Sequence, residues 1–81
     1  MKIRVLFFSL LQDITGTASV EWDCTGVTTV ADVLGLAFAR WPALEAWDNS
    51  LLVAVNQTYV KRDAVVEDGA EVALMPPVQG G

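Results

Sequence analysis

Residues 29–41 read TVADVLGLAFARW, and this stretch decides the fold. Its apolar residues recur at spacings of three and four, which is the pattern of an amphipathic α-helix. Thr29 is suited to cap this helix, and Asp32 lies in the first turn, where the helix dipole favours a negative charge. The apolar face consists of Val30, Val33, Leu34, Ala37, Phe38 and Trp41. One apolar face needs one further layer to cover it.

Strand-like segments flank the helix on both sides. They are rich in β-branched and aromatic residues, or are continuous apolar runs, and we place them at residues 2–9, 18–23, 51–55, 58–61 and 71–75. Asn56-Gln57 and Asp68-Gly69 have the composition of tight turns. Pro76-Pro77 ends the last strand because proline lacks the amide hydrogen of the ladder. We expect a connection with a helical turn at 10–17 and a short helical piece at 43–47.

The order strand, strand, helix, strand, strand, strand favours a two-layer α+β domain. We predict a β-grasp (ubiquitin-like) fold, in which a mixed five-stranded sheet packs on one main helix. The helical crossover permits the last strand to run parallel beside the first. The β-grasp domain is expected to span residues 1–76, followed by an extended C-terminal tail at 77–81 that ends in Gly-Gly.

Composition disfavours several classes of partner and location. The chain has 81 residues, a formal net charge of −5 and a single cysteine. This acidity disfavours nucleic acid and anionic membranes as partners, and no apolar run approaches the roughly 20 residues of a membrane span. The start, MKIRVLFFSLL, imitates a secretory signal, but it alternates like a strand and carries no convincing cleavage site. We therefore expect a cytoplasmic protein.

Side chains with catalytic potential are scarce. The chain has no histidine and no cysteine pair, so neither a metal site nor a nucleophile–base set is expected. The segment after the last strand, PPVQGG, is different. Glycine permits close backbone approach, so Gly80 and Gly81 can thread a narrow channel and present the α-carboxylate of Gly81 to another protein. We assign the threading role to Gly80, Gln79, Val78, Pro77 and Pro76.

Alternation along the strands predicts an exposed apolar patch. Lys2 and Arg4 should face water, which places Phe8 on the outer face of the sheet. The same rule turns Met75 and Tyr59 outward. If the first and last strands are neighbours, Phe8, Tyr59 and Met75 form a docking surface beside the tail.

Three segments carry a resemblance to a known family: IRVLFFSLL near the start, LLVAVNQTYV in the middle and VEDGAEVALMPPVQGG at the end. The sequence resembles the MoaD family of sulfur carriers, the small subunits of molybdopterin synthase. The resemblance implies that an adenylyltransferase of the ubiquitin-activating type uses ATP to adenylate Gly81. A sulfur donor protein then supplies the sulfur of a thiocarboxylate. This chain itself would bind no cofactor.

The resemblance also implies the acceptor and the assembly. The tail would enter the large subunit of molybdopterin synthase and donate sulfur to cyclic pyranopterin monophosphate, which forms the molybdopterin dithiolene. Two small and two large subunits would form a heterotetramer, with the catalytic residues on the large subunit. Phe8, Tyr59 and Met75 correspond to the contact surface, although position 75 is usually aromatic in this family, and Gln12-Asp13 replaces a frequent Arg-Glu pair.

Two alternatives remain open. One is another β-grasp sulfur carrier, such as the one that feeds thiazole synthesis for thiamine, with the same chemistry at Gly81 and a different acceptor. The other is a ubiquitin-like protein modifier, in which Gly81 forms an isopeptide bond to a lysine.

Overall fold

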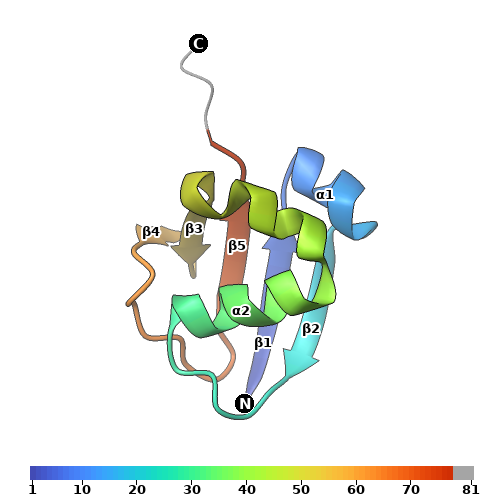
Figure 1. Ribbon diagram of the computed structural model, residues 1–81. Helices are drawn as coiled ribbons and strands as arrows, with labels where there is room; N and C mark the ends of the chain where they lie inside the picture. The colour runs from blue at the N-terminus through green and yellow to red at the C-terminus, as the bar shows by residue number, and fades with distance from the viewer. Residues whose placement is uncertain (78–81) are drawn as a thin grey trace.

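A mixed sheet with a helix lying across one face forms the fold (Figure 1). The computed structural model describes residues 1–77 of the chain. Within them, five strands have the spatial order β2-β1-β5-β3-β4. Their bounds are β1 Lys2–Phe7, β2 Ser19–Asp23, β3 Leu52–Val55, β4 Thr58–Val60 and β5 Glu71–Met75, and the helical segments are α1 Leu10–Thr15, α2 Val30–Arg40 and the 3-10 helix η1 Pro42–Ser50. β1 and β5 are parallel and the other pairs antiparallel, so the predicted β-grasp fold is confirmed.

Helix α2 forms where the apolar spacing predicts it. Its N-terminus carries a capping box, in which the Thr29 hydroxyl accepts the Asp32 N–H and the Asp32 carboxylate accepts the Thr29 N–H. The amide and hydroxyl of Thr28 donate to the same carboxylate. These hydrogen bonds, led by the Thr28 amide, lower the pKa of Asp32 from its ordinary value of 3.8.

The core lies between α2 and the facing side of the sheet. Val5 of β1 pairs in register with Val72 of β5, and Phe7 pairs with Leu74. All four side chains are buried, as are Val30, Val33, Leu34 and Ala37 of α2. Phe38 and Trp41 are half-buried. The ring of Trp41 meets Phe7 edge-on at 5.0 Å and stacks on Trp22 at 6.0 Å, so it closes the core at the β2 edge.

The end of β1 differs from the sequence prediction. We expected the strand to reach residue 9, but it ends at Phe7. Ser9 has φ 53° and ψ −131°, a conformation that turns the chain out of the sheet and that L-residues rarely adopt. The chain then forms α1, a complete short helix closed by Gly16 at φ 77°, where we expected a connection with one helical turn.

The other bounds differ by small amounts. The helical piece predicted at 43–47 extends over Pro42–Ser50 as η1, with proline at its first position. The strands β2, β3 and β4 are each one residue shorter than expected. None of the helices within residues 1–77 has the length and apolar content that a membrane crossing requires.

Candidate functional site on the outer face of the sheet

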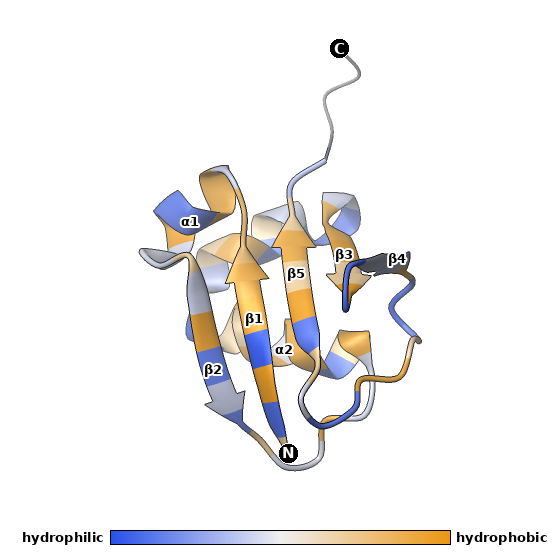
Figure 2. Ribbon diagram, turned by 180° about the vertical axis from the view of Figure 1, so that it is seen from behind, coloured by the Kyte–Doolittle hydropathy of each residue, from blue (hydrophilic) through white to orange (hydrophobic). Residues whose placement is uncertain are grey.

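The face of the sheet opposite α2 changes character along β1 and β5. No helix of residues 1–77 crosses this face, and Figure 2 shows hydrophilic positions where these two strands begin and apolar positions where they end. Lys2 and Arg4 occupy outer positions at the start of β1, whereas Leu6 lies further along the same side. The apolar part of this face is therefore at the end of the sheet from which the chain leaves β5.

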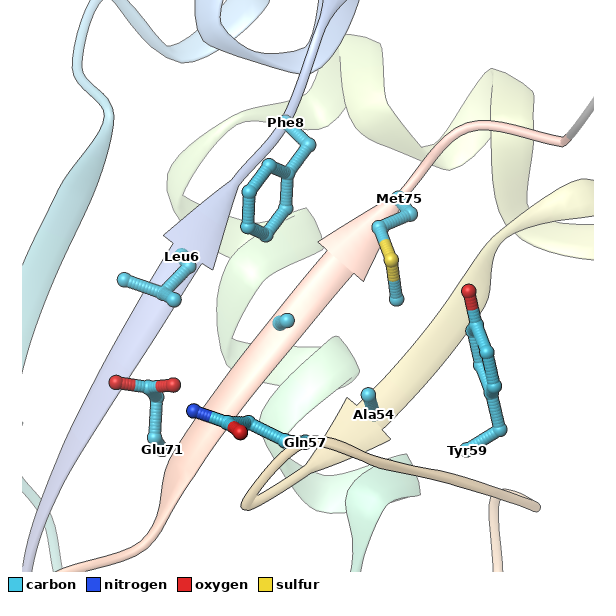
Figure 3. Close-up of a pocket in the computed structure, with 8 residues that line it drawn as sticks. Leu6, Phe8, Ala54, Gln57, Tyr59, Glu71 and Met75 are labelled. Carbon is cyan, nitrogen blue, oxygen red and sulfur yellow. The ribbon is translucent and has the colours of Figure 1, made fainter.

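A shallow groove of about 290 Å³ lies in this region. Its lining side chains come from four strands and the turn between β3 and β4, and Figure 3 shows them from the solvent side: Leu6, Phe8, Ala54, Gln57, Tyr59, Glu71, Ala73 and Met75. We refer to this feature as the outer groove. It contains the three residues that alternation assigns to a docking surface, namely Phe8, Tyr59 and Met75.

Strand register produces the shape of the groove. Leu6 pairs with Ala73, Ala73 pairs with Ala54, and Ala54 pairs with Tyr59, so four neighbouring strands contribute outer-face residues in one row. Because alanine is small, the middle of this row forms a floor between larger flanking side chains. Short side chains at positions 54 and 73 thus make a hollow on a sheet that would otherwise be flat.

The larger side chains form the walls of the groove. Tyr59 is 68% exposed and Phe8 is 43% exposed, while Met75 is half-buried between them. Phe8 lies one residue beyond β1, yet its amide still donates to the Leu74 carbonyl at 3.2 Å, which keeps it beside β5. The structure therefore brings the three predicted residues together, and their role in binding a partner stays a prediction.

One end of the outer groove is polar, and this end lies outside the docking surface predicted from the sequence. Glu71 and Gln57 lie at the end away from Met75 and Phe8 (Figure 3). Alternation along β5 would have placed Glu71 on the same face as Ala73 and Met75. For Gln57, the sequence predicts only a place in a tight turn. Its φ of 71°, with 50° at Asn56, confirms that turn and directs Gln57 to the groove.

The chain leaves β5 at the apolar end of the groove. Pro76 and Pro77 follow Met75 directly and are half-buried. The remaining residues of the predicted threading segment, Val78, Gln79, Gly80 and Gly81, lie outside the described residues. The boundary of the tail at residue 77 likewise stays a prediction.

The described residues offer little reactive chemistry of their own. No group of three or more potential metal ligands occurs within residues 1–77. Cys24 is half-buried after β2 and lies in a separate hollow beside Trp22 and Leu36, not in the outer groove. An exposed groove with apolar walls is the type of surface on which other proteins commonly dock.

The sequence and the fold of this chain are similar to those of known proteins. The model of the ThiS family matches residues 5–81. The chain is 42% identical over 81 residues to the molybdopterin synthase sulfur carrier subunit of Escherichia coli, covering 98% of this chain and 99% of that protein. It is 35% identical over 81 residues to the subunit of the same name from Haemophilus influenzae, with the same coverage. The crystal structure of Haloferax volcanii small archaeal modifier protein 1 superposes with a TM-score of 0.83 at 28% identity, covering 95% of this chain and 98% of that one.

Proposed function

Since the chain belongs to the ThiS family, and relatives that it matches over nearly their whole length are sulfur carrier subunits of molybdopterin synthase, we propose that it acts as such a subunit. In this proposal Gly81 carries the sulfur atom and the outer groove docks the protein onto its partners. The observation that carries the proposal is the position of the groove. Its apolar walls lie directly beside Pro76 and Pro77, where the chain departs toward Gly81.

The carrier chemistry takes place on the main chain. A separate adenylyltransferase uses ATP, and the Gly81 carboxylate attacks the α-phosphate while pyrophosphate leaves. The outer sulfur of a persulfide on a donor protein then attacks the acyl carbon and AMP leaves, and a thiol cleaves the S–S bond of the resulting acyl disulfide, which releases the thiocarboxylate and leaves the donor in a disulfide. Adenylate is a good leaving group, and the thiocarboxylate is ionised at neutral pH and is a soft nucleophile. None of these steps requires a side chain of this protein.

The large subunit is the proposed acceptor site. The tail enters it, and the thiocarboxylate donates sulfur to cyclic pyranopterin monophosphate; two donations build the dithiolene of molybdopterin. Residues that bind the pterin and move protons then belong to the large subunit, in an assembly of two small and two large subunits. Because ATP and reduced thiols are needed, we place these reactions in the cytoplasm.

Mass spectrometry of the C-terminal peptide from native cells tests the proposal. Exchange of one oxygen for sulfur should add about 16 Da on the fragment that contains Gly81, and this fragment must exclude Met75, because methionine oxidation adds nearly the same mass. Sulfur at Gly81, transferred in vitro to the pterin precursor when the large subunit is added, supports the proposal. Gly81 found instead in isopeptide bonds to lysines would favour a modifier, and transfer only to a thiazole-forming enzyme would favour the other sulfur carrier.

A further inference from the structure

The polar end of the outer groove indicates which kind of side chain a partner must place there. We propose that the protein that fills the groove brings a cationic side chain, best an arginine, to the carboxylate of Glu71 and the amide of Gln57. This inference rests on the proposed function, since it describes the surface of the large subunit that docks here. It adds charge recognition to a surface that is otherwise apolar.

Glu71 forms no ion pair within residues 1–77. Arg4 is its register neighbour on β1, and Arg4 also pairs in register with Glu21 on β2. The Arg4 guanidinium lies 3.8 Å from the Glu21 carboxylate. No basic group of residues 1–77 forms an ion pair with Glu71. The ion pair of Arg4 thus forms on the β2 side of β1, and the Glu71 carboxylate on the β5 side has no ion-pair partner within residues 1–77.

The surroundings of Glu71 mean that a partner covering the groove would bury its charge. The residue is half-buried and shares the groove with Leu6, Ala73 and Met75. A partner that covered the apolar walls with an apolar surface alone would remove water from the Glu71 carboxylate without replacing its hydrogen bonds. Burial of an unpaired charge is costly, whereas a cation placed opposite offsets that cost. Among partners that can fill the groove, those with a matching cation are therefore favoured.

The backbone of Glu71 is held in position before any partner arrives. The amide of Glu71 donates to Asn56 Oδ1 at 3.0 Å, and the amide of Asn56 donates to the carbonyl of Glu71 at 2.8 Å. These two hydrogen bonds tie the turn between β3 and β4 to the start of β5, so Gln57 and Glu71 stay at one end of the groove. A carboxylate and a side-chain amide that line the same end of the groove suit the planar array of donors on a guanidinium better than the single ammonium of lysine.

Titration calorimetry with the large subunit tests the inference. Wild type, Glu71→Gln and Glu45→Gln are compared at low and at high salt. Glu45 is exposed on η1, in the opposite layer, so its variant removes the same charge at a distance from the groove. We expect Glu71→Gln to weaken binding about tenfold or more and to reduce the salt dependence of the affinity. Glu45→Gln should stay within about twofold of wild type, as distant charges on the surface are screened.

A double-mutant cycle identifies the cation. Arginines and lysines on the docking face of the large subunit are replaced by glutamine one at a time, and one of them should lose affinity with wild type but not with Glu71→Gln. Equal binding by Glu71→Gln and wild type, with Glu71→Gln unfolding at the wild-type temperature, would overturn the inference and leave the proposed function intact. Failure of wild type to bind the large subunit at all would instead count against the proposed function.

Discussion

Truncating Phe8 to alanine should weaken binding to the large subunit by roughly 30-fold. Phe8 is 43% exposed in the free protein. A phenylalanine side chain presents roughly 200 Å², so about 85 Å² stays open to water on the outer groove. Covering that area is worth about 2 kcal/mol at about 25 cal/mol per Å². Since about 1.4 kcal/mol is tenfold in the dissociation constant, the loss corresponds to roughly 30-fold.

Leu36 provides the matched control for this measurement. It is 40% exposed, almost the same fraction as Phe8, but it lies on α2 in the opposite layer and does not line the outer groove. Leu36→Ala therefore removes a similar exposed apolar area without touching the proposed docking surface. Its affinity for the large subunit should stay within about twofold of wild type, because scattered surface residues contribute little to binding.

Calorimetric titration of each variant with the large subunit gives the dissociation constants, and thermal unfolding shows that each variant is folded. Phe8→Ala also loses the part of its ring that packs against the protein, so its unfolding temperature must be compared with wild type before the affinities are interpreted. Equal affinities for Phe8→Ala and wild type, or equal losses for Phe8→Ala and Leu36→Ala, would refute the assignment of docking to the outer groove.

Further substitutions test the turn, the helix cap and the tail. Gln57→Gly should raise the free energy of unfolding by about 0.5–1 kcal/mol and Tm by about 3–6 °C. The reason is that glycine adopts the positive φ without strain, and this gain exceeds the cost of the greater entropy of the unfolded chain. An equal rise for Gln57→Ala in scanning calorimetry would contradict this reason. Thr29→Ala should lower the free energy of unfolding in urea by about 1 kcal/mol, since it removes the capping hydroxyl. The pKa of Asp32 in the folded state is lowered from 3.8, so its ionised carboxylate stabilises the fold above that pH, and this contribution is lost as pH falls through the lowered pKa. The loss of stability caused by Asp32→Asn should therefore disappear in acid. A loss of stability that persists in acid would show that it has a cause other than the carboxylate charge. Adding one residue after Gly81 should abolish sulfur transfer with Tm unchanged, and retained transfer would show that the α-carboxyl of Gly81 is not the carrier.

Periodicity was sufficient to predict most of the fold. The spacing in 29–41 placed one helix, and alternation in the strands assigned the inner and outer faces, because both patterns follow directly from backbone geometry. The same alternation brought Phe8 and Met75 to one face, and the parallel pairing of β1 with β5 made them neighbours. These predictions depend only on which side a residue faces, so errors of one or two residues at strand ends did not affect them.

The remaining features depend on contacts that periodicity does not encode. The early end of β1 results from the positive φ of Ser9, and serine gives no local signal for that conformation in the way that glycine would. Glu71 lacks an ion pair because Arg4, which has Glu21 and Glu71 as register neighbours on either side, pairs with Glu21. This arrangement involves three strands and is visible only in the assembled sheet. The polar end of the groove was therefore missed although its position on the outer face was predictable.

The gradient along the outer face links docking to delivery of the tail. Lys2 pairs in register with Asp23, and Arg4 with Glu21, so the start of β1 presents a solvated set of charges that an apolar partner would have to strip of water. Partner contact is thus favoured at the far end of the sheet, beside Pro76, where the chain departs. A partner bound in the opposite orientation along the groove would place its apolar surface over Glu71 and leave that carboxylate without a cation. If the proposed docking is correct, the contacts that give affinity therefore also fix the direction in which the partner meets the tail.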